Sequence, residues 1–171
     1  MALTVLLGGA RSGKSALAVE TARAWSGPVL FVATGTARDD EMAARIAHHR
    51  AERPLHWTTL EDPTGLVEAL REAAPDQLVL VDCLSLWVSN LLEQGWGDDA
   101  VESEARSAAG AAAGRGAPTI VVSNEVGLGV VPATPLGRRY RDLLGRVNAI
   151  FAAEAEEASF VVAGRRLRLE A

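Results

Sequence analysis

The sequence predicts an α/β fold in which a mostly parallel sheet is flanked by helices, and three observations lead to this expectation. Short apolar runs of five or six residues, typical of strands buried on both faces, recur along the chain. They alternate with longer segments of helical composition, and turn residues separate the two kinds of segment. The first run leads directly into a glycine-rich turn and then into a helix.

The expected elements follow one another along the whole chain. Strands are expected at 3–7, 28–33, 55–61, 77–82, 118–123, 159–163 and 165–169, and helices at 14–23, 39–54, 63–73, 84–92, 100–114 and 135–157. Within the fourth of these helices, Trp87 is expected in the core or at a subunit contact. No linker or repeat interrupts the pattern, and 171 residues is about the length of one domain. We therefore expect a single nucleotide-binding domain over residues 1–171.

The turn after the first strand fits the phosphate-binding loop pattern G-x-x-x-x-G-K-[ST]. Glycines let successive backbone N–H groups point inward and bind an anion, and the following helix adds its positive N-terminal end. Lys14, the only lysine of the chain, would contact the β and γ phosphates, and the Ser15 hydroxyl could ligate Mg²⁺. A glycine-rich turn without a ligand is the alternative. The expected nucleotide-binding residues here are Gly8, Gly9, Ala10, Arg11, Ser12, Gly13, Lys14 and Ser15.

Other polar residues follow expected strands. Asp82 ends the apolar run 77–82, and a carboxylate in that place holds Mg²⁺ directly or through water beside a phosphate loop. The turn Thr34-Gly35-Thr36 is placed to touch nucleotide, because ligands of open α/β sheets bind beyond the carboxyl ends of strands; a plain turn is equally compatible. Asn124 and Glu125 are candidates for contacts to Mg²⁺ or to an acceptor hydroxyl, or else belong to a structured turn.

Two adjacent histidines fall in the helix expected within 39–54. Helical spacing puts Arg45 and His49 on one face, and His48 points about 100° away from His49. A neutral imidazole flanked by guanidinium groups is a plausible nucleophile towards a phosphate. The alternative is a surface helix of mixed charge. Zinc is a weaker idea, since the one cysteine is distant in the sequence.

Composition excludes some classes of protein. A net charge of −5 argues against a nucleic-acid binder. Cys83 is alone, so no intramolecular disulfide is possible. No apolar run reaches the length of a membrane span, and the sequence opens on a strand without a basic leader. We expect a cytoplasmic protein.

Four blocks together resemble one family. They are GGARSGKS, DDEMAARIAHHRAERPLHWTTLE, VLVDCLSLWVSNLL and SNEVGLGVVPATPLGRRYRDLLGRVN. In this order and spacing they are similar, over nearly the whole chain, to the bifunctional adenosylcobinamide kinase/adenosylcobinamide-phosphate guanylyltransferase family of cobalamin biosynthesis. The resemblance implies that ATP or GTP phosphorylates the aminopropanol hydroxyl of adenosylcobinamide. GTP then guanylylates a histidine with loss of pyrophosphate, and the phosphorylated corrinoid takes the GMP to give adenosylcobinamide-GDP.

The resemblance also implies a RecA-like sheet, a homotrimer and particular site residues. The family's R-I-x-x-H-R context places the reacting histidine on His49, and His48 is kept as the alternative. Nucleotide contacts are carried over to Gly8 to Ser15, Thr34, Gly35, Thr36, Arg50, Ala51, Glu52, Arg53, Glu61 and Asp82.

Two other functions compete with this one. A P-loop kinase with structural histidines would perform only the first reaction. A RecA-like ATPase module acting on a nucleic acid is the third possibility, and the acidic net charge counts against it.

Overall fold

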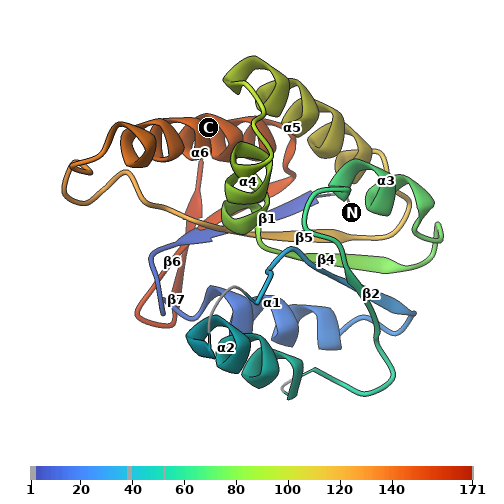
Figure 1. Cartoon of the computed structure of the whole chain (residues 1–171). Helices are drawn as coiled ribbons and strands as arrows, with labels where there is room; N and C mark the ends of the chain where they lie inside the picture. Colours follow the sequence, from blue (N-terminus) through green and yellow to red (C-terminus); the bar gives the residue numbers. More distant parts are fainter. Residues whose placement is uncertain (1–2, 38–39, 52, 171) are drawn as a thin grey trace.

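The computed structural model contains one seven-stranded sheet with the strand order β3-β2-β4-β5-β1-β6-β7 (Figure 1). It describes residues 3–37, 40–51 and 53–170, except for the side chains at 41, 42, 45, 48, 49 and 51. The first six strands run parallel, and β7 pairs antiparallel with β6. The strands are β1 (Leu3–Gly8), β2 (Val29–Ala33), β3 (Thr58–Glu61), β4 (Leu78–Asp82), β5 (Thr119–Asn124), β6 (Glu157–Val162) and β7 (Arg165–Leu169).

Helices cover both faces of the sheet, as the fold-class prediction requires. Figure 1 shows α3 to α6 on one side and α1 and α2 on the other. The helices are α1 (Lys14–Arg23), α2 (Asp40–Ala51), α3 (Leu66–Glu72), α4 (Leu84–Glu93), α5 (Asp98–Ala113) and α6 (Pro135–Glu154). Within the described part of the chain, no helix is both long and apolar enough to cross a bilayer.

The alternation of side chains along the strands creates two cores. Successive residues of a strand point to opposite faces. In β1, Leu3, Val5 and Leu7 therefore pack into the core beneath α3 to α6, whereas Leu6 packs with α1 on the other face. Trp87 of α4 is fully buried in the first core, as expected, and its indole N–H donates to the Thr64 carbonyl at 2.9 Å. Burial on both faces explains the near-continuous apolar runs in the sequence.

Two expected elements begin later than their sequence patterns indicate. The strand expected from Leu55 starts only at Thr58, because the chain first turns: the Trp57 N–H donates to the Pro54 carbonyl at 3.1 Å. The helix expected from Pro63 or Thr64 starts at Leu66, because the Asp62 carboxylate accepts hydrogen bonds from the N–H groups of 64 and 65 and holds them in a turn.

The last helix is also shorter than predicted. Thr134 caps α6 by accepting a hydrogen bond from the Gly137 N–H at 3.1 Å, with Pro135 at the start of the helix as expected. The predicted end near Glu157 is wrong, since α6 ends at Glu154. The Glu156 N–H donates to the Leu3 carbonyl at 3.0 Å, which commits the chain to β6 beside β1.

Candidate functional site

The turn between β1 and α1 has the geometry of a phosphate-binding loop. Gly13 has a φ of 96°, a left-handed conformation that favours glycine, and Lys14 begins α1 immediately after it. Gly8 has no room for a side chain, because a Cβ there would collide with the Val161 carbonyl and the Ser12 hydroxyl. The expected residues Gly8 to Ser15 thus run without a break from the end of β1 through the turn to the first residues of α1, and Ala10 and Arg11 are exposed.

A β-hairpin packs against this turn. Ala163 and Gly164, with φ values of 50° and 72°, form the two-residue turn between β6 and β7. The Gly164 N–H donates to the Ser12 carbonyl at 2.9 Å, and a Cβ on Gly13 would lie 3.3 Å from the Gly164 Cα. The hairpin therefore fixes the backbone of the phosphate-binding turn.

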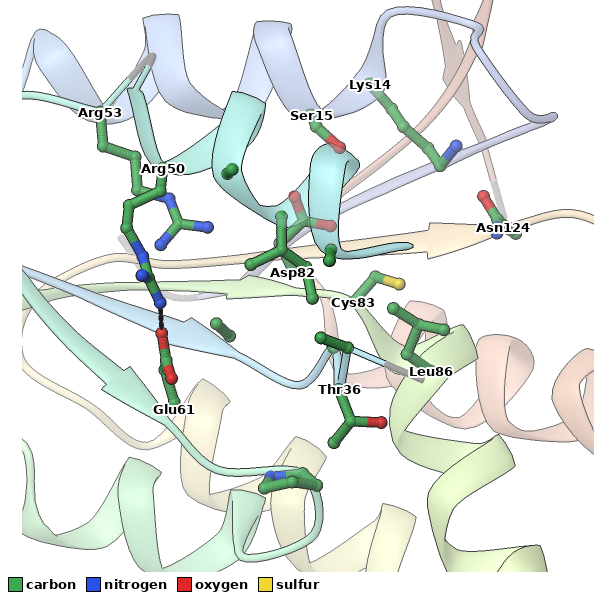
Figure 2. Close-up of a pocket in the computed structure, with 17 residues that line it drawn as sticks. Lys14, Ser15, Thr36, Arg50, Arg53, Glu61, Asp82, Cys83, Leu86 and Asn124 are labelled. Carbon is green, nitrogen blue, oxygen red and sulfur yellow. Dashed lines mark hydrogen bonds and ion pairs between the residues drawn. The ribbon is translucent and has the colours of Figure 1, made fainter. Parts of the chain in front are cut away.

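A cavity of about 650 Å³ opens next to the turn (Figure 2). Lys14 is 7% exposed, and its ammonium group donates to the Gly9 carbonyl at 2.8 Å, so the cation is held within the loop. The lining residues come from the start of α1, from the ends of four strands and the segments after them, from α2 and the segment after it, and from α4. They are Lys14, Ser15, Ala33, Gly35, Thr36, Ala37, Ala43, Ile46, Ala47, Arg50, Arg53, Glu61, Pro63, Asp82, Cys83, Leu86 and Asn124.

The strand order explains why these polar residues meet. Strands β2, β4, β5 and β1 are consecutive neighbours in a parallel sheet, so their carboxyl ends share one edge. Thr36 follows β2, Asp82 ends β4, and Asn124 ends β5. Figure 2 shows Asp82 between Lys14 at one end of the cavity and Arg53 at the other. The cavity therefore offers two cationic side chains that could bind a polyphosphate and a carboxylate that could bind its counter-ion.

Thr34 lies outside this cavity lining, although its neighbours Gly35 and Thr36 belong to it. Its side chain is fully buried. The hydroxyl donates to the Cys83 carbonyl at 2.7 Å and accepts from the Cys83 N–H at 2.8 Å, while the Asn90 amide donates to the Thr34 carbonyl at 2.8 Å. Thr34 therefore ties the end of β2 to the start of α4.

Helix α2 covers the cavity and brings in two arginines near its end. Arg50 forms an ion pair with Glu61 at the end of β3. The Arg53 guanidinium lies over the Phe31 ring, with 3.5 Å between its central carbon and the ring centroid. Burial lowers the pKa of Arg53, with a further decrease from Arg50, and Asp82 opposes this. Two guanidinium groups beside an acid suit the binding of a nucleotide phosphate.

Part of the predicted site lies outside the described residues. The backbone at His48 and His49 belongs to α2, but their side chains, and those of Arg45 and Ala51, are outside the description, as is Glu52 altogether. The predicted roles of these residues therefore stay predictions.

Sequence reasoning missed the apolar wall of the cavity. Ile46 and Ala47 of α2 face it from one side, and Leu86 of α4 faces it from another. Cys83 also lines the cavity; burial, followed by the nearby Asp82 charge, raises its pKa to about 11, so its thiol is protonated at neutral pH. The spacing of Ala43, Ile46, Ala47 and Arg50, typical of one helical face, was the available signal.

Comparisons with known proteins agree with this architecture. Residues 4–169 match the family model described as cobinamide kinase / cobinamide phosphate guanyltransferase. The bifunctional adenosylcobalamin biosynthesis protein CobP of Pseudomonas aeruginosa is 45% identical over 97% of this chain and 96% of its own length. The proteins named CobU in Escherichia coli and Salmonella typhimurium are 40% and 38% identical, each over 98% of this chain and 99% of its own length.

Among solved structures, an ATPase from the type III secretion system of pathogenic bacteria superposes with a TM-score of 0.55 at 12% identity. The match covers 93% of this chain and half of that one, and it shows the α/β P-loop fold. The matches over nearly the full length lead to a firmer conclusion. This chain belongs to the cobinamide kinase / cobinamide phosphate guanyltransferase family, whose matched relatives are bifunctional enzymes of adenosylcobalamin biosynthesis.

Proposed function

We propose that this chain phosphorylates adenosylcobinamide with ATP or GTP and then transfers GMP from GTP to the product through a guanylyl-histidine at His49. The products of the proposed guanylyl transfer are adenosylcobinamide-GDP and pyrophosphate. One observation carries it: the phosphate-binding turn and the helix that contains His49 border the same cavity, through Lys14 and Ser15 on one side and Ala47 and Arg50 on the other.

In the kinase step, the donor's phosphates lie on the turn. Backbone N–H groups and the positive end of α1 bind the β and γ phosphates, and Lys14 exchanges its contact with the Gly9 carbonyl for a phosphate oxygen. The acceptor hydroxyl then attacks the γ phosphorus, and the nucleoside diphosphate leaves. Catalysis rests on positioning and charge neutralisation, which is the usual requirement of phosphoryl transfer.

Ser15 and Asp82 fit a magnesium ion bound with the nucleotide. Both supply oxygen donors, both line the cavity, and Mg²⁺ is commonly held by one or two protein oxygens together with phosphates and water. Within the described residues, no group of three or more His, Cys, Asp or Glu side chains gathers as a protein-only metal site. When bound, the ion would neutralise charge on the phosphates. Ser15 and Asp82 would hold it in the cavity.

In the guanylyl step, a neutral imidazole attacks the α phosphorus of GTP. The bond to pyrophosphate breaks, pyrophosphate leaves with the electron pair, and the imidazole loses its proton to solvent. Arg50 and Arg53 would hold the departing pyrophosphate or the phosphate of the incoming corrinoid. The turn presents the γ phosphate, whereas the histidine must reach the α phosphate. Either GTP binds in two ways or α2 moves between the steps.

Labelling with [α-³²P]GTP tests the covalent step. We expect a protein-bound label that is labile to acid and stable to alkali, absent from His49→Ala and retained in the neighbouring control His48→Ala. Loss of label from His48→Ala alone would move the acceptor to that residue. Kinase activity without any label in the wild type would leave a monofunctional kinase.

We also propose that the enzyme is a cytoplasmic homotrimer. Support for self-association comes from exposed apolar side chains after β5, namely Leu128, Val130, Val131 and Leu136, because clustered exposed apolar residues often mark interfaces. Sedimentation equilibrium should give three times the chain mass, and a monomer mass would contradict the assembly. Cell fractionation tests the compartment.

A further inference from the structure

Strand β5 lies between the two parts of the site that bind a nucleotide's charge. Its neighbours are β4, which ends at Asp82, and β1, which ends at Gly8. In the parallel register Asn124 is the partner of Gly8, and Val122 is the partner of Asp82. A phosphate chain that extends from the phosphate-binding turn towards the Asp82 carboxylate must therefore pass over the end of β5.

The side chain at that end is Asn124, and it lines the cavity. Figure 2 shows it at the same end of the cavity as Lys14, away from Arg50 and Arg53. Its neighbour in the sequence behaves differently, since the Glu125 carboxylate accepts a hydrogen bond from the Gly127 N–H within its own loop. Within the described part of the chain, no hydrogen bond engages the Asn124 amide. Of the two sequence candidates, Asn124 is the one available to a ligand.

The backbone of Asn124 is fixed from two sides. Asn148 of α6, only 4% exposed, donates its amide N–H to the Asn124 carbonyl at 3.0 Å. The next N–H, that of Glu125, donates to the Gly8 carbonyl at 3.0 Å and links the ends of β5 and β1. These bonds hold the backbone from which the Asn124 side chain enters the cavity before substrate binds, and a fixed backbone favours the preorganised geometry that catalysis requires.

We propose that Asn124 is a catalytic residue of the kinase step, and that its side-chain amide donates a hydrogen bond to the γ-phosphoryl group during transfer. The inference rests on the proposed kinase reaction. In that reaction the bond between the γ phosphorus and the β–γ bridging oxygen breaks, and the nucleoside diphosphate leaves with the electron pair. The acceptor oxygen forms the new bond to phosphorus, and its proton passes to solvent. Charge on the transferring oxygens is what a fixed donor stabilises.

The two half-reactions make the role testable. Asn124→Ala and Asn124→Asp are compared with wild type and with Gln94→Ala, a control that removes an exposed side-chain amide outside the cavity lining. Phosphorylation of adenosylcobinamide is followed with γ-labelled nucleotide, and histidine guanylylation with α-labelled GTP. Loss of one fixed donor lowers kcat on the order of 10²-fold, so we expect that loss in the kinase reaction of Asn124→Ala with KM nearly unchanged. The guanylylation and melting temperature of Asn124→Ala, and both activities of Gln94→Ala, should stay at wild-type values.

The aspartate variant separates donation from other roles. It keeps the shape but presents an anion to the phosphate, so we expect a kinase loss at least as large as that of alanine. Wild-type kinase activity in Asn124→Asp would indicate a proton acceptor and overturn the inference. So would an unchanged kcat in Asn124→Ala, or equal losses of both half-reactions and of melting temperature. Failure of the proposed function looks different, because the wild type itself would then neither phosphorylate nor become labelled.

Discussion

The guanidinium of Arg53 lies over the ring of Phe31, with its central carbon 3.5 Å from the ring centroid. Phe31 belongs to the core on the α1 face of the sheet, so this stacking fixes the arginine against a rigid surface. Cation–π contact orients the planar guanidinium while leaving its edge free to bind a phosphate. The pair thus joins the segment after α2 to the sheet beneath the cavity.

Arg53→Lys should therefore impair nucleotide handling more than folding. Lysine keeps the charge but loses the planar fork and the stacking, and a charge-assisted hydrogen bond contributes about 1.5–3 kcal/mol. We expect guanylylation by [α-³²P]GTP to fall on the order of tenfold or more, with the melting temperature unchanged. The same substitution at the exposed Arg71 of α3 is the control. Equal labelling by Arg53→Lys and wild type would remove Arg53 from the site.

Lys14→Ala should reduce both activities by on the order of 10²-fold or more, because it removes a charge directed at the transferring phosphate. Steady-state kinase assays and histidine labelling measure the two losses separately. Retained kinase turnover would contradict the assignment of the turn. Retained labelling alone would mean that the guanylyl donor binds elsewhere in the cavity.

Ser15→Ala and Asp82→Asn should raise the Mg²⁺ concentration needed for half-maximal kinase activity. Each removes or weakens one oxygen donor to a metal ion that the phosphates still hold. Titrating activity with Mg²⁺ after EDTA treatment measures the shift. Ser107→Ala, on the remote helix α5, should titrate like wild type, and an identical titration in all variants would exclude these two donors.

Thr34→Val tests the structural role of a residue that the sequence placed at the nucleotide. Valine is nearly isosteric but leaves the buried N–H and carbonyl of Cys83 without the Thr34 hydroxyl. A buried polar group left unpaired costs about 1–3 kcal/mol, so urea unfolding should show that the free energy of unfolding falls by at least that amount. Thr34→Ser keeps the hydroxyl and should lose much less. If the Thr34→Val protein keeps full stability but binds nucleotide less tightly, Thr34 contacts the nucleotide instead.

Stability should fall as pH rises from about 9 to 11. Burial raises the pKa of Cys83 from 9.0 to about 11, so over this range the unfolded chain loses the thiol proton while the folded chain keeps it. The folded state then binds more protons, and a rise in pH favours unfolding. Denaturant titrations across this range should give a flatter profile for Cys83→Ala. Burial, followed by the nearby Cys83, raises the pKa of Tyr140 to about 12, so the difference between the two proteins reports the thiol together with its effect on Tyr140. Parallel profiles would contradict the assignment.

The fold class was predictable because its signals are local. A strand buried on both faces reads as an apolar run, and the phosphate-binding turn is a contiguous motif. Element ends were less predictable, since they depend on contacts made elsewhere. Helix α6 stops at Glu154 because the N–H of residue 156 pairs with Leu3, far away in the sequence. The late start of β3 likewise depends on the turn from Pro54 to Trp57, whose indole packs in the core.

The candidate site divides along the same line. Lys14, Ser15 and Asp82 could be found from patterns within one strand and its following turn, and all three line the cavity. The apolar wall of Ile46 and Leu86 could not, because two separate helices form it only after the sheet has set its strand order. That order does not follow the sequence, so no local pattern shows that β5 ends beside the turn.

Through the hydrogen bond from the Gly164 N–H to the Ser12 carbonyl, the turn between β6 and β7 supports the nucleotide site of the enzyme. Substitutions in that turn should weaken the binding of a nucleoside triphosphate even when the sheet stays intact. Screens for defective variants should then recover substitutions about 150 residues downstream of the glycine-rich motif that copy its phenotype.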